Sequence, residues 1–229
     1  MNNNQYIVAA VGTWNKENFC SLSRNLHGSW FFVDNPEDLT DLLRKVDPKY
    51  IFFPHWRWIV PAIILNKYEC VCFHMTDVPY GKGGSPLQNL IVRGHKKTVL
   101  TALRMTEELD AGPIYAKEPL DLSGNAEAIY RRASLLTWDV IAEIIESEPK
   151  PKVQIGESVS FSRRKPEHSV IPRGLSLEQI YDYIRMLDAP GYPKACLELD
   201  DYYIEFEAAS LSDNAVIAKA VVKIKPKDH

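Results

Sequence analysis

The sequence predicts an α/β fold: a Rossmann-like, mostly parallel sheet flanked by helices, with a small, mainly β subdomain at the C-terminal end. Three observations predict it. Short apolar runs alternate with helical patterns through the first half of the chain. The composition shifts at 148–152, where two prolines lie among charged residues. Beyond that shift, apolar runs follow one another with a single helical pattern among them. We therefore expect one domain over 1–150 and a second over 151–229.

Six short runs in the first domain, rich in apolar and β-branched residues and bounded by turn residues, have the character of strands. The predicted strands are Tyr6–Val11, Trp30–Val33, Tyr50–Phe53, Cys70–His74, Thr98–Met105 and Pro113–Glu118. We expect Pro54 and Pro119 to end two of them, because proline cannot donate a hydrogen bond to a strand ladder.

The predicted helices begin at capping residues. Asn35-Pro36 and Ser85-Pro86 each place a cap before a proline at the first helical position, and Asn125 precedes the longest amphipathic pattern. The predicted helices are 15–26, 35–45, 85–94, 125–146 and 176–187. The predicted strands of the C-terminal subdomain are Ala195–Leu199, Tyr202–Ala208 and Ala215–Ile224.

The composition indicates a globular protein without a broad charged face. The 229 residues include 27 Lys and Arg against 30 Asp and Glu, a net charge of −3. This balance argues against a nucleic-acid partner held by a basic surface. No run reaches about 18 apolar residues, and the segment MNNNQYIVAAVG lacks the charge of a signal peptide. We therefore expect a cytoplasmic protein that does not bind membranes.

The cysteines do not indicate a metal site, because they form no CxxC pair and have no histidine at ligand spacing. They are Cys20, Cys70, Cys72 and Cys196. We expect them to be reduced and mostly buried, and we expect no metal. The sequence also lacks a GxGxxG fingerprint, and the glycine-rich run 81–85 lacks the spacing of a phosphate-binding P-loop.

The segment 73–91, FHMTDVPYGKGGSPLQNLI, carries the clearest functional signal. His74 ends a predicted buried strand, and a glycine-rich loop and a helix N-terminus follow it. Ligands of open α/β sheets bind at the carboxyl ends of the strands, so His74 lies where a catalytic residue is expected. The alternative is a strand-end histidine whose hydrogen bonds are satisfied by the backbone.

A second signal follows 36 positions after His74, at Leu109-Asp110-Ala-Gly112 in a tight turn. With His74-Met-Thr-Asp-Val-Pro79 and Lys82-Gly-Gly-Ser-Pro86, this turn resembles the signature of the folate-dependent formyltransferases. That signature reads His, S-L-L-P, R-G-x-x-P and L-D-x-G, with the same spacing between His and Asp. The segments 161–166 and 180–191 continue the resemblance, which covers most of 5–210.

The resemblance implies transfer of a formyl group from 10-formyltetrahydrofolate to a primary amine. It makes 1–150 the catalytic α/β domain and 151–229 an OB-like remnant. The tetrahedral intermediate carries an oxyanion and a cationic nitrogen, so the site needs a donor for the oxygen and an acceptor for the proton. We assign His74 to the oxyanion, and Asp110 to orient His74 and accept the proton through water. The alternative for Asp110 alone is a turn residue that makes Asx hydrogen bonds.

The family pattern also implies residues that bind the two substrates. The expected cofactor-binding residues are Trp56, Arg57, Trp58, Gly83, Thr106, Glu107, Glu108, Leu109 and Asp110. The expected acceptor-binding residues are Tyr80, Lys82 and Gly84. The aromatic segment 54–58 has an alternative interpretation as a tryptophan pair buried under the sheet. The basic run 163–165 either holds phosphates or is a solvated surface run.

Cys72 departs from the family pattern, which has Asn two residues before the His. A thiol is a poor hydrogen-bond donor and does not replace a carboxamide at an oxyanion. Another donor then supplies that contact, with His55 as one candidate, or His74 and backbone groups stabilise the oxyanion. A catalytic role for Cys72 is doubtful, and the alternative is a small buried strand residue. A non-catalytic folate-binding paralogue remains an alternative for the whole chain.

The acceptor amine is inferred from chain size, charge and one motif. Family members that act on tRNA have a longer chain with a basic C-terminal domain. Those of the purine pathway have a shorter chain in which the Asn of the motif is intact. The variant H-M-T-D-x-P-Y-G-K-G-G-S-P is similar to sugar formyltransferases of the pseudaminic acid type, which serve surface polysaccharides, and to formylation domains of peptide synthetases. We expect a UDP-linked 4-amino-4,6-dideoxy-N-acetylhexosamine as acceptor and a homodimer. The alternative acceptors are an aminoacyl carrier and aminoacyl-tRNA.

Overall fold

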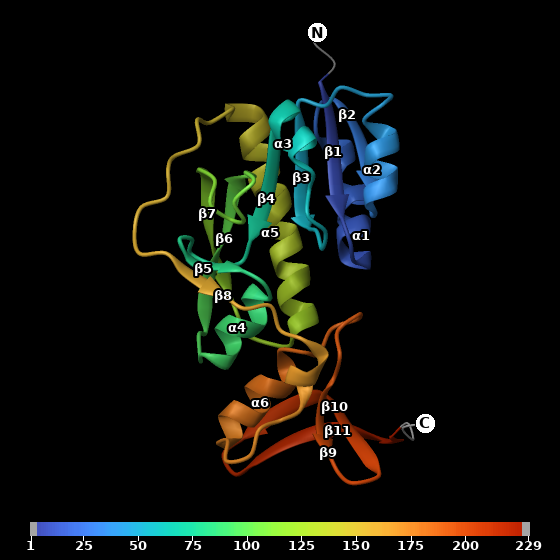
Figure 1. The fold of residues 1–229 in the computed structure, drawn as a ribbon, viewed down its shortest axis with the longest axis vertical. Helices are drawn as coiled ribbons and strands as arrows, with labels where there is room; N and C mark the ends of the chain where they lie inside the picture. The colour runs from blue at the N-terminus through green and yellow to red at the C-terminus, as the bar shows by residue number, and fades with distance from the viewer. Residues whose placement is uncertain (1–3, 226–229) are drawn as a thin grey trace. The chain divides into compact units, whose positions relative to one another are not determined.

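The computed structural model describes residues 4–225, which form two compact units (Figure 1). The first unit takes residues up to Gly83, then Thr98–Leu120 and Tyr130–Ser160. The second takes Gly84–Lys97, Asp121–Ile129 and residues from Phe161 onward. The chain therefore passes between the units several times, whereas the sequence-based division places one boundary at 150. That division stays a prediction about the family's domains.

A six-stranded sheet with the order β2-β1-β3-β4-β6-β7 forms most of the first unit. Its strands are β1 (Gln5–Ala10), β2 (Ser29–Val33), β3 (Tyr50–His55), β4 (Cys70–His74), β6 (Lys97–Arg104) and β7 (Ile114–Asp121). The β1–β2, β1–β3 and β3–β4 pairs are parallel, and β4 pairs with β6 in the antiparallel sense. The predicted Rossmann-like, mostly parallel sheet is confirmed.

Aromatic side chains cover one face of this sheet beneath α1 (Thr13–Leu22) and α5 (Ala126–Ser147). The ring centroid of Trp138 on α5 lies 5.7 Å from that of Trp30 on β2 and 6.2 Å from that of Phe19 on α1. Figure 1 shows α5 running along the sheet. Among residues 4–225, no helix is long and apolar enough to cross a membrane.

The opposite face packs against α2 (Pro36–Leu42) and α3 (Ala62–Lys67). Leu39 and Ile64 from these helices belong to one buried cluster with apolar side chains of β1, β2, β3 and β4. Helices thus cover both faces, so the central strands are buried on both sides, as their continuous apolar sequence requires.

Predicted caps explain where two of the helices, α2 and α5, begin. Oδ1 of Asn35 accepts the amide of Asp38 at 2.8 Å, and Oδ1 of Asn125 accepts the amide of Ala128 at 3.0 Å. Ser85 is different: it has a φ of 52°, caps α4 (Pro86–Val92) with no side-chain hydrogen bond, and its Oγ accepts the amide of Arg164 instead. The Ser-Pro pattern located this helix, but not its capping contact.

Several sequence expectations are wrong in detail. Pro54 and Pro119 lie inside β3 and β7 and do not end those strands. Cys20 is exposed, whereas Cys70 and Cys196 are buried and Cys72 is half-buried. The sequence did not predict α3, nor a two-stranded sheet of β5 (Tyr80–Gly83) and β8 (Val159–Phe161). These elements are short and carry weak periodicity, so their surroundings determine them.

The second unit contains α4, α6 (Leu177–Arg185) and an antiparallel sheet of order β11-β10-β9. Its strands are β9 (Ala195–Glu198), β10 (Tyr202–Ser212) and β11 (Ala215–Ile224), which confirms the predicted β-rich C-terminal region. Ser176 caps α6 by accepting the amide of Gln179 at 3.3 Å. The buried Arg185 donates to Asp182 and to the carbonyls of Leu122 and Gly124.

Candidate functional site

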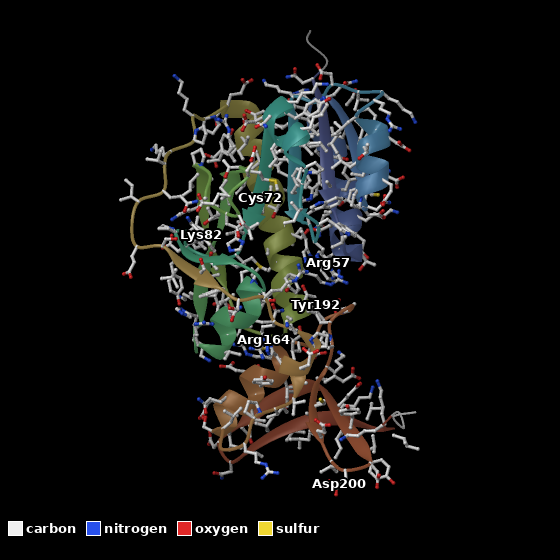
Figure 2. The ribbon with its side chains drawn as sticks, in the orientation of Figure 1. Arg57, Cys72, Lys82, Arg164, Tyr192 and Asp200 are labelled. Carbon is white, nitrogen blue, oxygen red and sulfur yellow. The ribbon has the colours of Figure 1, made fainter. Side chains whose placement is uncertain are left out.

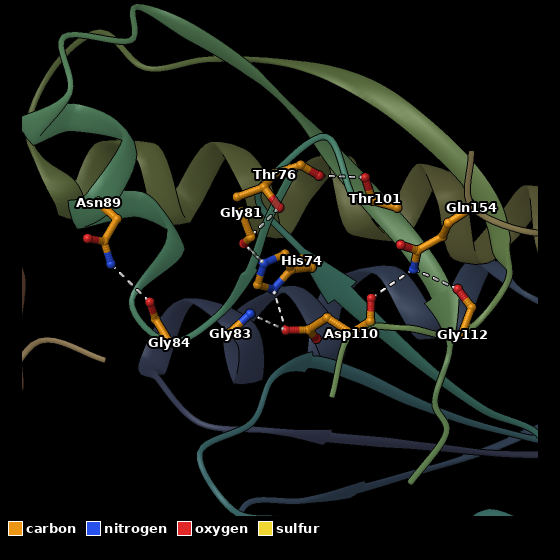
Figure 3. Close-up of polar contacts among 10 residues, drawn as sticks. All are labelled: His74, Thr76, Gly81, Gly83, Gly84, Asn89, Thr101, Asp110, Gly112 and Gln154. Atoms are coloured by element: carbon orange, nitrogen blue, oxygen red, sulfur yellow. Dashed lines mark hydrogen bonds and ion pairs between the residues drawn. The ribbon is translucent and has the colours of Figure 1, made fainter. Parts of the chain in front are cut away.

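His74 and Asp110 meet at the carboxyl end of β4 (Figure 3). His74 is the last residue of that strand and lies opposite Thr101 of β6. The side chains of His74 and Asp110 are 9% and 10% exposed, and Nδ1 of His74 lies 3.6 Å from Oδ2 of Asp110. Two residues that are 36 positions apart in sequence therefore form one nearly buried His–Asp pair, as the motif spacing predicts.

A carbonyl group fixes the orientation of the His74 ring. Nε2 of His74 lies 2.8 Å from the carbonyl oxygen of Gly81. A carbonyl only accepts hydrogen bonds, so Nε2 carries a proton and donates it there. Nδ1 is the ring nitrogen that faces Asp110. In this arrangement the Nε2 proton is already used by Gly81, so an oxyanion donor role for His74 stays a prediction.

Two threonines hold the turn that presents Gly81. Oγ1 of Thr76 donates to the Gly81 carbonyl at 3.2 Å, and Oγ1 of Thr101 donates to the Thr76 carbonyl at 2.7 Å. Thr76 and Thr101 are fully buried. The histidine is therefore oriented by a chain of hydrogen bonds that links β4, the following turn and β6.

Asp110 is held in a strained backbone conformation. Its φ is 52°, in the left-handed region that Asp and Asn tolerate better than most residues. Oδ2 of Asp110, the atom that faces His74, also accepts the amide of Gly83 at 2.8 Å. Gly83 has a φ of 95°, which a side chain would disfavour. The glycine-rich loop thus fixes the carboxylate of Asp110 through its backbone.

Cys72 lies on the same side of β4 as His74, two residues earlier in the strand. Burial raises the pKa of the Cys72 thiol, and the carboxylate of Asp110 raises it further. The thiol therefore stays protonated at neutral pH and is not an activated nucleophile. This agrees with the interpretation of Cys72 as a small strand residue.

The two tryptophans after β3, Trp56 and Trp58, differ in burial, so each fits a different interpretation of segment 54–58: a buried packing residue or an exposed stacking surface. Trp56 is half-buried against the cluster under α2 and α3, and its ring meets that of Trp58 edge-on with centroids 4.8 Å apart. Trp58 is 43% exposed. Arg57 is exposed and lies well apart from Lys82 in Figure 2. A stacking role for Trp58 stays a prediction, whereas Trp56 mainly packs against the sheet.

The remaining residues predicted to bind cofactor or acceptor lie in the first unit with His74 and Asp110, except Gly84, which belongs to the second unit. Thr106, Glu107, Glu108 and Leu109 are exposed, and Oγ1 of Thr106 donates to the carbonyl of Glu108 at 2.9 Å. Tyr80 and Lys82 lie on β5 and are half-buried. Gly84 belongs to the second unit, where an added Cβ would lie 2.5 Å from Cβ of Arg163.

Sequence reasoning missed Gln154. Its side chain contacts the loop of Asp110, but it stands in the stretch EPKPKVQIG, which has the composition of a linker. The available signal was a single polar residue between Val153 and Ile155. In an extended segment, that alternation turns one side chain to the protein and two to solvent.

His55 makes stability depend on pH. Its ring packs beside those of Trp14 and Tyr130, with centroids 6.2 Å and 5.3 Å away. Burial, with a smaller effect of Arg57, lowers the pKa of His55 from 6.5 to about 4. Between these values the unfolded chain binds a proton that the folded protein excludes, so stability falls as pH drops from 6.5 to 4. Partial exposure limits the expected loss to roughly 2–3 kcal/mol.

Urea unfolding of wild type and His55→Phe at pH 7 and pH 4.5 measures this effect. The wild type should lose more stability between the two pH values than the variant, because the phenylalanine ring does not titrate. His27→Phe is the matched control at an exposed histidine, and it should keep the wild-type pH dependence. An unchanged pH dependence in His55→Phe would contradict the assignment.

Comparison with known proteins places the chain in a family. A model described as "Formyl transferase" matches residues 33–138, and one described as "Methionyl-tRNA formyltransferase, C-terminal domain" matches residues 166–225. A solved methionyl-tRNA formyltransferase from Clostridium thermocellum is 42% identical, with a TM-score of 0.94 over 97% of this chain and 100% of that one. The chain therefore belongs to the formyl transferase family.

Curated relatives are more distant. The methionyl-tRNA formyltransferase of Wolinella succinogenes is 28% identical over 62% of this chain and 48% of that protein. The GDP-perosamine N-formyltransferase of Brucella melitensis is 28% identical over 74% of this chain and 69% of that protein. This chain thus spans about half the length of the curated methionyl-tRNA formyltransferases that it matches.

Proposed function

We propose that this protein transfers a formyl group from 10-formyltetrahydrofolate to a primary amine. The observation that carries the proposal is the nearly buried pair of His74 and Asp110, at the carboxyl end of β4 and at the spacing of the family motif. Membership of the formyl transferase family supports the reaction class. Both nitrogens of His74 are positioned by neighbours, which is typical of a side chain prepared for proton transfer.

The pair has two tasks in this reaction. The amine must attack in its uncharged form. Its nitrogen becomes cationic in the tetrahedral intermediate and must then lose a proton. Nδ1 of His74 and Oδ2 of Asp110 lie 3.6 Å apart, so a proton taken by either group is stabilised by the other. The bond between the formyl carbon and N10 then breaks, and tetrahydrofolate leaves with a proton on N10.

An aminoacyl group, carried by tRNA or by another carrier, is the first candidate acceptor. The support comes from the 42% identical structure, a methionyl-tRNA formyltransferase that this chain matches over its full length. Several curated relatives carry the same description. These relatives weigh against the sequence-based preference for an amino sugar and against the expected absence of a nucleic-acid partner.

A nucleotide-linked amino sugar is the second candidate. The net charge of −3 lacks the excess of Lys and Arg that strong tRNA binding uses. The match to GDP-perosamine N-formyltransferase covers more of that relative, 69%, than the match to the curated tRNA enzymes covers of theirs. A UDP-linked sugar of the pseudaminic acid type is the specific form that the motif variant favours.

A parallel acceptor assay tests the proposal. Wild-type protein is mixed with 10-formyltetrahydrofolate and, separately, with methionyl-tRNA, a GDP-linked 4-amino sugar and a UDP-linked 4-amino sugar. Tetrahydrofolate release and the gain of one CO in the acceptor mass measure turnover. Acceptor-dependent turnover supports formyl transfer and identifies the acceptor class. The absence of turnover with every acceptor, together with no thermal shift on adding 5-formyltetrahydrofolate, would contradict the proposal.

The salt dependence of KM distinguishes the two acceptors independently. A tRNA acceptor contacts the protein through several phosphates, so its KM should rise steeply between about 50 and 200 mM salt. A nucleotide sugar has two phosphates, and its KM should change little over the same range.

A further inference from the structure

We propose that Gln154 is a positioning residue that holds the backbone of the Asp110 loop in the geometry that formyl transfer requires. This inference rests on the proposed function. Nε2 of Gln154 donates to the carbonyl of Asp110 at 2.7 Å and to the carbonyl of Gly112 at 2.8 Å. One amide group therefore binds the backbone on both sides of Ala111, and Figure 3 shows Asp110 between His74 and Gln154.

The two contacts determine which way the amide points. Both partners are carbonyl oxygens and accept only, so the NH₂ group must face them. Turning the amide over would place three oxygens together. Oε1 of Gln154 is buried and has no hydrogen-bond partner among the residues that the structure describes. The side chain thus uses its donors on the loop although its acceptor stays unsatisfied, which indicates that the donor contacts are the ones that matter.

The backbone around Gln154 is itself fixed. The amide of Ile114 on β7 donates to the carbonyl of Lys152 at 2.7 Å, and the Lys152 amide donates back at 2.8 Å. Val153 and Ile155, on either side of Gln154, are 76% and 88% exposed. The alternation along this extended segment therefore turns only Gln154 toward the loop.

The loop needs such a support. Asp110 has a φ of 52°, and the residues before it from Thr106 to Leu109 are exposed. The backbone bond inside the turn, from the amide of Ala111 to the carbonyl of Glu108, is long at 3.4 Å. Without Gln154, the carboxylate of Asp110 would depend mainly on the Gly83 amide for its position. Small displacements of a catalytic group can cost about 10²-fold in rate.

Hydrogen exchange of the wild type and Gln154→Glu tests the contact without any need for activity. Glutamate has the same shape, but its carboxylate cannot donate and repels the two carbonyls. The amides of residues 108–112 should exchange at least about tenfold faster in the variant. Gln179→Glu is the matched control, because the side-chain oxygen of Gln179 accepts the amide of Ser176 and a carboxylate preserves that role. It should leave the exchange of 108–112 unchanged.

Enzyme kinetics separate positioning from a general structural role. Gln154→Glu should lower kcat/KM about 10²-fold in the wild type. In Asp110→Asn, where the carboxylate is already lost, the same change should have less than about a threefold effect, because coupled residues are not additive. Gln154→Asn keeps the donors on a shorter chain and should retain more activity than Gln154→Glu.

Each outcome decides the inference. Unchanged exchange of 108–112 in Gln154→Glu overturns it, whatever the activity. An equal loss of kcat/KM in the wild-type and Asp110→Asn backgrounds also overturns it, because Gln154 would then act independently of Asp110. If the wild-type protein transfers no formyl group, the proposed function is wrong. The hydrogen-exchange measurement still decides whether Gln154 holds the loop.

Discussion

Replacing Asp110 with asparagine should lower kcat/KM for formyl transfer about 10³-fold, with little change in the stability of the fold. Asparagine tolerates the left-handed φ of 52° and keeps an oxygen that accepts the Gly83 amide. It removes the charge 3.6 Å from Nδ1 of His74, and with it the carboxylate that stabilises a proton on that nitrogen. Steady-state kinetics with the acceptor from the parallel assay, together with thermal unfolding, measure both effects.

His74→Ala extends this prediction. Its loss in kcat/KM should be similar, and the double variant should be little worse than either single one, because the two side chains act as a unit. Asp213→Asn, at an exposed turn position, is the control and should keep wild-type activity. If Asp110→Asn retained wild-type activity, the proposed role of the pair would be wrong.

Gly112→Ala should destabilise the protein by about 3 kcal/mol or more and should displace the Asp110 loop. A Cβ at Gly112 would lie 1.9 Å from the carbonyl oxygen of Arg104, and that atom is backbone in β6, so no side-chain rotation relieves the clash. The amide of Arg104 also donates to the carbonyl of Pro113 at 2.8 Å, which ties the two segments together. Urea unfolding and kcat/KM should therefore both report the change.

Gly94→Ala is the matched control for this substitution. A Cβ there meets nothing within 4 Å, and only its φ of 79° opposes the change. The expected cost is about 1–2 kcal/mol from backbone strain, with no effect on kcat/KM. A Gly112→Ala variant no less stable than Gly94→Ala would show that the loop moves away from β6 at little cost.

Features that depend on residues close together in the sequence, such as strand bounds and helix caps, are predicted well. The strand Cys70–His74 is found with the predicted bounds, and the predicted caps Asn35 and Asn125 accept amide hydrogen bonds as expected. Ser176, predicted only as the start of a helix, also accepts one. The pairing of His74 with Asp110 followed from a motif and not from the sheet topology. β6 is antiparallel to β4 and its last residue, Arg104, lies opposite Val71, so the loop after β6 must return toward His74 to bring the two side chains within 3.6 Å.

Features that depend on distant contacts were not predictable in the same way. The Gly81 carbonyl orients His74, and no side chain marks that contact in the sequence. Ser85 stands in the sequence pattern of a helix cap, but its hydroxyl accepts a hydrogen bond from the amide of Arg164, 79 positions away. Gln154 was overlooked because prolines and lysines around it suggest a linker, whereas the segment pairs with β7. In each case tertiary contact overrides a local preference.

The interleaving of the two units limits how this protein can be divided. A fragment cut at residue 150 would retain Gly84–Lys97 and Asp121–Ile129 but lose the remainder of the second unit. The separated C-terminal piece would leave Arg185 without its carbonyl partners at Leu122 and Gly124. The C-terminal region therefore cannot be exchanged on its own, and chimaeras that exchange the second unit between relatives would have to carry all three stretches together.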